Sequence, residues 1–203
     1  VLATLALSLI LAFAFKPGVV EPQFAFSEGG KLGLSWLGTP DIRFALGLDG
    51  LSFWLYLLTS VLMVPAIFAS WESITERAPL HYAFLLMLHS GLLGLFASLD
   101  VVLFYIFFEF SLIPLFFLIG LWGGSERRQA SVTFFLSPLA GSLLTLLGVI
   151  ALVIVHQQHS PSHTLTFSLP ELTQGLANLP WNDWKKSTPW SASPQVLIFL
   201  LLF

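Results

Sequence analysis

Residues 101–122, VVLFYIFFEFSLIPLFFLIGLW, decide the fold of this chain. The stretch is almost wholly apolar and long enough for one helix to cross a bilayer, which takes about 20 residues at a rise of roughly 1.5 Å each. Glu109 stands in its interior, where an ionised acid costs about 2.5–3.5 kcal/mol on insertion scales. Pro114, five residues on, has no N–H, and its ring crowds the carbonyl of Phe110. A buried acid beside a weakened helix backbone indicates a working site.

The composition is that of an integral membrane protein with several helices. Of the 203 residues, 56% are hydrophobic and 9% are charged, whereas an average soluble domain has about 25% charged residues. The net charge of -3 is small and the basic residues form no patch, so the sequence gives no support for nucleic-acid binding. The 203 residues include no cysteine, which excludes disulfides, iron–sulfur clusters and thiolate zinc sites within them.

Five apolar runs and the start of a sixth predict an all-α fold, a polytopic transmembrane helix bundle. The five runs are residues 1–15, 48–70, 80–99, 101–122 and 131–155, and the sixth begins at 195–203. Between them lie two long polar loops, 16–47 and 156–194, and two short charged loops, 71–79 and 123–130. We expect a single domain over residues 1–203, and we expect it to be part of a longer chain because both ends fall inside an apolar run.

The distribution of positive charge predicts the orientation of the bundle. Arg77, Arg127 and Arg128 are concentrated in the short loops, whereas the Lys and Arg residues of the long loops are more numerous but diluted. Since basic residues close to the ends of spans stay on the cytoplasmic side, the short loops are predicted to be cytoplasmic. Asp49 is expected to cap the helix that follows it, and Asp100 is expected to make a tight turn.

Glu109 is the first candidate functional residue. Burial disfavours the charged form of a carboxylate because that form loses its solvation, and a nearby cation favours it again. If a cation approaches and withdraws, Glu109 takes up and releases a proton, which is what a proton relay requires. The alternative is a structural carboxyl, held neutral or permanently paired between helices. Tyr105, one turn earlier on the same face, is a candidate hydrogen-bond donor, although a packed aromatic is its commoner role.

His89 is the second candidate, because it lies near the middle of residues 80–99 and titrates near physiological pH. The runs 80–99 and 101–122 are joined by the turn at Asp100 and must be antiparallel neighbours. His89 and Glu109 then lie at similar depth and can meet if both face inward. The alternative is a neutral histidine that is hydrogen-bonded to a helix carbonyl.

Other polar residues give weaker signals. Pro161 disrupts the only helical register that would bring three nearby histidines together, and no acid or cysteine stands beside them, so we expect no metal site at His156, His159 and His163. Four hydroxyls inside the spans could order water, although such groups more often bond back to their own helix. These are Thr59, Ser137, Ser142 and Thr145. The sequence contains no phosphate loop, dinucleotide fingerprint or nucleophile elbow.

Two segments resemble a known family: LGLDGLS (46–52) and FASLDVVLFYIFFEFSLIPLFFLIGLWGG (96–124), the second followed by Arg127 and Arg128. They resemble subunit M (NuoM) of bacterial respiratory complex I, which is called chain 4 in mitochondria. The likeness covers most of residues 45–155. It implies an antiporter-like fold of about fourteen transmembrane helices, with two inverted repeats of about five helices that each hold a broken helix.

On that resemblance, Glu109 matches the essential glutamate of the family's fifth helix, and the first run here is the family's second helix. The lysine that pairs with this glutamate belongs to the family's seventh helix and would lie beyond Phe203. Thr133 is a departure, because the family often has a lysine at this position, before the paired Phe134 and Phe135. The resemblance assigns no role to His89.

The function implied by the resemblance is proton translocation coupled to quinone reduction by an NADH:quinone oxidoreductase. The chain would be a non-redox subunit of this translocase without a cofactor of its own, since NADH, FMN, iron–sulfur clusters and quinone belong to partner subunits. It would lie in the bacterial inner membrane, in contact with lipid and with other membrane-arm subunits. A large subunit of a multisubunit sodium/proton antiporter or of a membrane-bound hydrogenase is an alternative with the same fold and glutamate. A purely structural membrane subunit is the second alternative.

Overall fold

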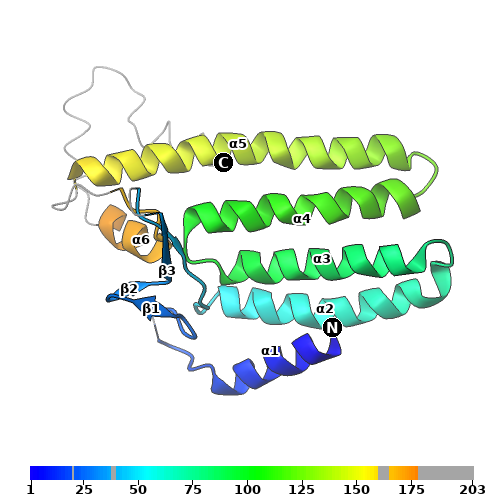
Figure 1. Cartoon of the computed structure of the whole chain (residues 1–203), viewed down its shortest axis with the longest axis horizontal. Coiled ribbons are helices and arrows are strands. Elements are labelled where there is room, and N and C mark those ends of the chain that lie inside the picture. The colour runs from blue at the N-terminus through cyan, green and yellow to red at the C-terminus, as the bar shows by residue number, and fades with distance from the viewer. Residues whose placement is uncertain (20, 38–39, 160–164, 178–203) are drawn as a thin grey trace. The chain divides into compact units, whose positions relative to one another are not determined.

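The computed structural model describes all residues except 20, 38–39, 160–164 and 178–203. The chain, drawn in Figure 1, divides into two compact units, and each is described separately below. Unit 1 comprises residues 1–34 and 44–135, and unit 2 comprises residues 35–43 and 136–203. The predicted start of a further span, 195–203, lies outside the described residues.

Within the described residues, four helices are long and apolar enough to cross a membrane, which confirms the predicted transmembrane helix bundle. They are α2 (Ser52–Ser73), α3 (Ala78–Ala97), α4 (Val101–Trp122) and α5 (Arg127–His159). The helix that precedes them, α1 (Leu2–Ala14), is apolar but shorter. Since α4 begins and ends at the predicted residues, its uninterrupted apolar run was sufficient to define it.

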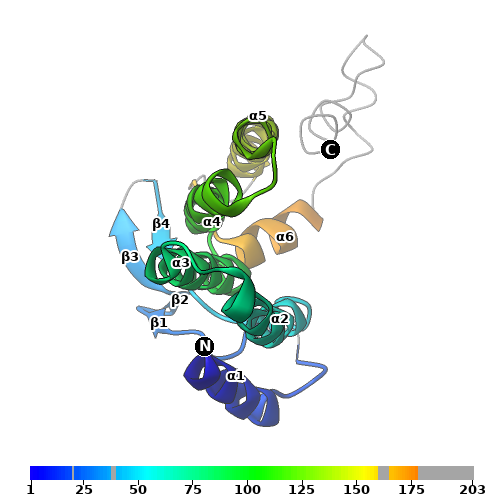
Figure 2. The same cartoon turned by 90° about the vertical axis from the view of Figure 1, so that its right-hand side faces the viewer.

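The helices of unit 1 pack in chain order, α1 on α2, α2 on α3 and α3 on α4 (Figure 2). Short connections force the order of α2, α3 and α4, because a helix that follows a tight turn must run back beside its predecessor. The contact between α3 and α4 is close, since an added Cβ on Gly91 would lie 3.2 Å from Cδ1 of Phe110. On Gly94 it would lie 2.6 Å from Cζ of Phe107. Glycines at a helix interface allow two backbones to approach in this way.

Two carboxylates hold the starts of helices in unit 1. Asp100 is 1% exposed, and its side chain accepts hydrogen bonds from the N–H groups of Val102 at 2.8 Å and Leu103 at 3.3 Å. The carboxylate of Asp49 accepts from the N–H groups of Leu51 at 3.0 Å and Ser52 at 2.7 Å. The prediction that Asp49 caps α2 is therefore confirmed. Each carboxylate supplies an acceptor to backbone donors that have no partner inside the helix.

The helix continues through Pro114, where the sequence predicts a weakened backbone. α4 is continuous from Val101 to Trp122 with Pro114 inside it, and Pro114 is fully buried. A proline removes one intrahelical hydrogen bond, and here its ring lies on the same face of α4 as Phe107 and Ser111, which packs against α3. Burial of this face supports the helix where the hydrogen bond is missing.

The loops are shorter and more ordered than the sequence predicts. The segment 16–47 contains four short strands, and a sixth helix lies in the segment 156–194. The strands are β1 (Ser27–Glu28), β2 (Lys31–Leu32), β3 (Leu34–Leu37) and β4 (Ile42–Phe44), and the helix is α6 (Leu169–Ala177). β1 and β2 are antiparallel, with Glu28 opposite Lys31. The turn between them has Gly29 at φ 62° and Gly30 at φ 80°, a conformation that favours glycine.

Three predicted boundaries also move. α2 continues to Ser73 and α3 begins at Ala78, so the connection predicted as 71–79 is reduced to 74–77. α5 begins at Arg127, which places Arg127 and Arg128 in its first turn and not in a loop. Charged residues are tolerated in these end turns because they lie at the level of the membrane surface, where hydropathy alone underestimates helix length.

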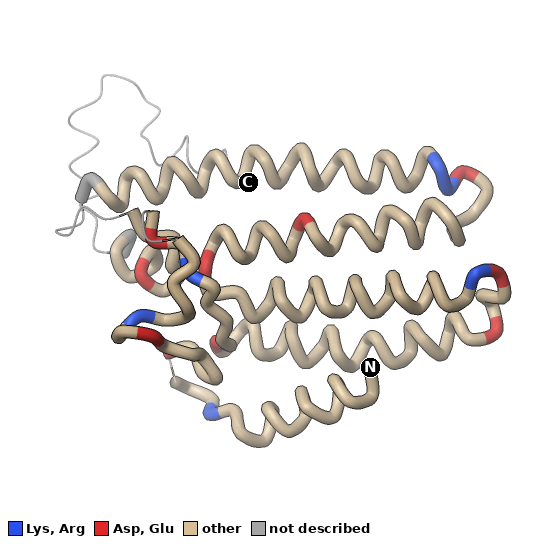
Figure 3. The backbone as a smooth tube through the Cα atoms, viewed as in Figure 1, with Lys and Arg blue, Asp and Glu red and all other residues tan. Residues whose placement is uncertain are grey.

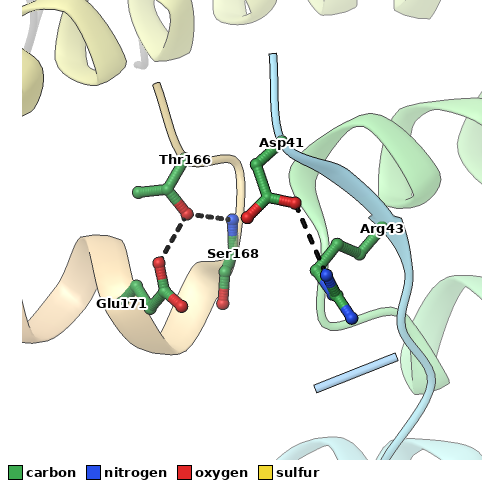
Figure 4. A network of polar contacts seen from close by, with 5 residues as sticks. All are labelled: Asp41, Arg43, Thr166, Ser168 and Glu171. Carbon is green, nitrogen blue, oxygen red and sulfur yellow. Dashed lines mark hydrogen bonds and ion pairs between the residues drawn. The ribbon is translucent and has the colours of Figure 1, made fainter. Parts of the chain in front are cut away.

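In unit 2, two segments that are far apart in the chain each carry polar contacts (Figure 4), and a backbone hydrogen bond joins them. The N–H of Asp41 donates to the carbonyl of Leu165 at 3.3 Å, and Nη1 of Arg43 lies 3.6 Å from Oδ1 of Asp41. The hydroxyl of Thr166 donates to Oε2 of Glu171 at 2.7 Å. The bond from Asp41 to Leu165 ties the residue before β4 to the segment before α6, a connection that no sequence motif indicated. The other two contacts lie within their own segments.

Candidate functional site

Glu109 lies near the middle of α4 and is partly buried. Among the described residues of α2, α3, α4 and α5, it is the charged residue that lies away from the helix ends; the others gather at the ends and in the connections (Figure 3). Leu112, one turn further along, is buried. Glu109 is thus a carboxyl in the middle of an apolar, membrane-length helix.

The face of α4 that carries Glu109 is opposite the face that packs against α3. Phe107, Phe110 and Ser111 are the residues of α4 nearest to the two interface glycines of α3. Glu109 is two positions from Phe107 and from Ser111, so at 3.6 residues per turn it projects about 160–200° away from them. Its side chain therefore points away from α3.

Glu109 shares its face of α4 with Phe116, which lies two turns further along. The ring of Phe116 packs edge-on against Phe135 at the start of α5, with ring centroids 5.6 Å apart. Gly120, one turn beyond Phe116, lies beside Ser131 of α5, since an added Cβ would be 3.3 Å from Oγ of Ser131. The face of α4 that carries Glu109 is therefore the one that continues into the contact with the first turns of α5.

His89 is buried, with 3% of its surface exposed. It is two positions from Gly91, the glycine that faces α4, and so projects about 160–200° away from that contact. The structure therefore places His89 and Glu109 on opposite sides of the α3–α4 pair and does not bring them together. The two glycines decide this result, because they select which faces of α3 and α4 meet.

The alternative expected for His89, a hydrogen bond to a helix carbonyl, is not formed by Nε2. This atom is buried and has no hydrogen-bond partner among the described residues. A buried ring nitrogen without a protein partner is uncommon, because at least about 90% of buried polar groups are paired with protein or ordered water. Nε2 of His89 is therefore a polar position inside the bundle that protein groups do not account for.

Tyr105 lies one turn before Glu109 on the same face of α4 and is partly buried. Its ring packs edge-on against Phe104, with centroids 5.8 Å apart and an interplanar angle of 84°. The aromatic role is thus present, and a hydrogen bond from Tyr105 to Glu109 stays a prediction.

Three of the four candidate hydroxyls form hydrogen bonds within their own helix, which is the commoner role named in the sequence analysis. Thr59 donates to the carbonyl of Leu55 at 2.8 Å, Ser142 to Leu139 at 2.9 Å and Thr145 to Gly141 at 3.0 Å. Each of these oxygens keeps acceptor capacity for a further bond. Ser137 is exposed.

Of the three histidines at and after the end of α5, the structure describes the side chain of His156. In unit 2, His156 is 9% exposed and its ring lies against Gly175 of α6. His163 and the side chain of His159 lie outside the described part of the chain. Within the described ranges no group of three His, Asp or Glu residues could hold a metal, and the expectation of no metal site here stays a prediction.

Comparison with known proteins gives consistent results. The family described as NADH:quinone oxidoreductase/Mrp antiporter, TM, matches residues 98–202, about half of the chain. Subunit M of the NADH-quinone oxidoreductase of Rhodobacter capsulatus is 34% identical over 200 residues, which cover 98% of this chain and 36% of that protein. Subunit M of the F(420)H(2) dehydrogenase of Methanosarcina mazei is 36% identical over 151 residues, which cover 74% of this chain and 29% of that protein.

A solved structure has the same fold. A chain of respiratory complex I from Thermus thermophilus with bound NADH superposes with a TM-score of 0.68 at 30% sequence identity, covering 97% of this chain and 35% of that one. The chain therefore spans about a third of the length of these relatives. The matched region contains Glu109, and the resemblance noted from residues 46–52 and 96–124 is confirmed.

Proposed function

The chain belongs to the NADH:quinone oxidoreductase/Mrp antiporter transmembrane family, and on that premise we propose that it is a proton-translocating membrane subunit of respiratory complex I. Quinone reduction elsewhere in the complex would drive proton movement through this chain. The likeness to subunit M of an NADH-quinone oxidoreductase and to a chain of complex I supports this function over an antiporter or a hydrogenase.

The names of the relatives also support a role in proton movement. NADH-quinone oxidoreductase and F(420)H(2) dehydrogenase are named for different electron donors, yet both contain a subunit similar to this chain. A subunit that is shared when the donor changes is expected to serve the step that both complexes have in common. We infer that the chain is a non-redox subunit, and that NADH, FMN, iron–sulfur clusters and quinone are held by its partners.

The single observation that carries the mechanism is the carboxyl of Glu109 in the middle of an apolar, membrane-length helix. In the protonated form this carboxyl is neutral and compatible with its surroundings; in the ionised form it needs a cation. A lysine on a later helix, beyond residue 203, is the expected cation. Its approach would favour release of the proton from Glu109, and its withdrawal would favour uptake. The carboxyl oxygens would therefore hold the proton between its uptake and its release.

This function implies particular partner subunits and a membrane location. The partners would be other membrane-arm subunits of complex I together with lipid, and the location the bacterial inner membrane, with several helices spanning it. The alternative of a purely structural subunit would use Glu109 as a fixed pairing residue. The two uses differ in one respect: only the first requires the charge of Glu109 to change during turnover.

The test is to replace Glu109 in the full-length chain and to measure proton pumping by the assembled complex in sealed vesicles. Glu109→Gln keeps the size of the side chain but cannot release a proton, so it should assemble and abolish pumping. Glu109→Asp keeps the acid and should retain part of the activity. Normal pumping by Glu109→Gln would refute the proposal, whereas an assembled but silent complex would exclude the structural alternative.

A second measurement separates complex I from an antiporter complex. Affinity purification of the full-length chain in mild detergent should recover NADH-binding and quinone-site subunits if the chain belongs to complex I. Recovery of a small membrane complex that lacks redox subunits would instead identify a sodium/proton antiporter.

A further inference from the structure

We propose that His89 is a second proton-holding site of this chain, where a bound water molecule contacts Nε2 on the side of α3 away from Glu109. The proposal rests on the proposed proton-translocating function. It starts from the buried Nε2 that lacks a hydrogen-bond partner among the described residues.

The position of His89 around α3 follows from its neighbours. Gly91 and Gly94, which contact α4, lie about 140–200° from His89 around α3, and the exposed residues Leu86 and Ser90 lie about 60–100° from it. His89 belongs to neither side and is 3% exposed. Since α2 is the other helix that packs extensively on α3, we infer that His89 is covered from the direction of α2.

α2 offers a polar group at the depth of His89. Ser60 lies 14 residues before Ile74, where α2 has ended, and His89 lies 12 residues after Arg77, where α3 begins. The two residues are therefore at nearly equal distances from the connection, within about 3 Å along the helix axes. Ser60 is 0% exposed, and its hydroxyl donates to the carbonyl of Tyr56 at 3.3 Å. Its oxygen keeps acceptor capacity for a further hydrogen bond.

The helix that carries His89 and the helix α2 packed beside it hold few charged side chains. Neither α2 between Ser52 and Trp71 nor α3 contains an Asp, Glu, Lys or Arg in the described structure. The titratable side chains of α2 are Tyr56 and, at its far end, Glu72; α3 also carries His81 and Tyr82. From α4, Tyr105 and Glu109 project to the opposite side. A proton on His89 would thus find no counter-ion on α3 or on α2 between Ser52 and Trp71.

Water gives this ring a chemical function. A water molecule supplies the hydrogen bond that Nε2 lacks, as buried waters commonly do at unpaired polar groups. In the step itself, a hydronium ion transfers H⁺ to the lone pair of Nε2, leaving water and an imidazolium; the reverse step returns the proton. No electron changes hands. Since His89 and Glu109 lie on opposite sides of the α3–α4 pair, protons would pass between them through water and not by direct transfer.

The experiment uses the full-length chain in the assembled complex and compares His89→Gln with His81→Gln. Both histidines lie on α3 and both have a buried ring nitrogen without a partner among the described residues. His81 stands in the first turn of α3, near the connection 74–77 at the end of the helix, and serves as the matched control. We expect the pumping rate in sealed vesicles to fall about a hundredfold with His89→Gln, at the low end of proton-transfer catalysis, and to stay within twofold of wild type with His81→Gln.

A high-resolution map of the wild-type complex provides a measurement that needs no variant. It should show an ordered water within hydrogen-bond distance of Nε2 of His89. A protein carbonyl bonded to Nε2 would overturn the proposal, as would wild-type pumping by an assembled His89→Gln complex. Glu109→Gln, measured in parallel, separates the two ideas. If it pumps normally, the proposed function fails; if it is silent while His89→Gln is normal, only the role of His89 fails.

Discussion

The close contact between α3 and α4 predicts that Gly94→Ala destabilises this protein. A Cβ on Gly94 would lie 2.6 Å from Cζ of Phe107 and closer still to its neighbouring ring atoms, so the ring or the helix must move. Overpacking of this kind typically costs about 1–3 kcal/mol. Alanine recovers about 0.5–1 kcal/mol relative to glycine inside a helix. The net expectation is a loss of about 0–2.5 kcal/mol in the free energy of unfolding.

Two other glycines calibrate the measurement. Nothing lies within 4 Å of a Cβ on Gly141, so Gly141→Ala should retain the helix gain and be neutral or stabilising. Gly91→Ala should fall between the two, since its nearest atom would be Cδ1 of Phe110 at 3.2 Å. The assay is the thermal unfolding of the full-length protein in detergent, with assembly checked in parallel.

A double variant tests the cause. If the ring of Phe107 is the obstacle, Phe107→Leu should reduce the cost of Gly94→Ala, and a double-mutant cycle should give a coupling of about 0.5–3 kcal/mol. Equal stability of Gly94→Ala and Gly141→Ala would refute the reasoning, and with it the assignment of the α3–α4 face that places Glu109 and His89 on opposite sides.

Three further predictions concern single residues. Asp100→Ala should destabilise the protein by about 1–2 kcal/mol, because the N–H groups of Val102 and Leu103 lose their acceptor, while Asp100→Asn should lose less; chemical denaturation would show the difference. Gly175→Ala should disturb unit 2, because its Cβ would overlap the ring of His156. Limited proteolysis should then change around residues 165–177, and an unchanged cleavage pattern would contradict this. Thr166→Val should lower the free energy of unfolding by about 1 kcal/mol, because the hydrogen bond to Glu171 is lost. Thr173→Val serves as the control, since this hydroxyl bonds only within α6, and it should have a smaller effect in thermal unfolding.

Local signals were sufficient for the long helices. Residues 101–122 are apolar apart from a few positions such as Glu109, so both ends of α4 followed from the positions where this run stops. The ends of α5 were wrong because Arg127, Arg128 and the polar residues after 155 interrupt the hydropathy without interrupting the helix. The short strands were missed because their pairing depends on partners several residues away: the two-residue strands β1 and β2 carry almost no pattern of their own.

The sequence by itself determined that this is a membrane bundle and that Glu109 is the residue to examine. Hydropathy and the energetic cost of a charge in lipid act on each residue separately, so they can be evaluated along the chain. Only the tertiary structure decided which way Glu109 and His89 point. That choice depends on where Gly91 and Gly94 let α3 approach α4, and an interface between two helices that are both apolar on all sides leaves no period in the sequence from which its face could be predicted.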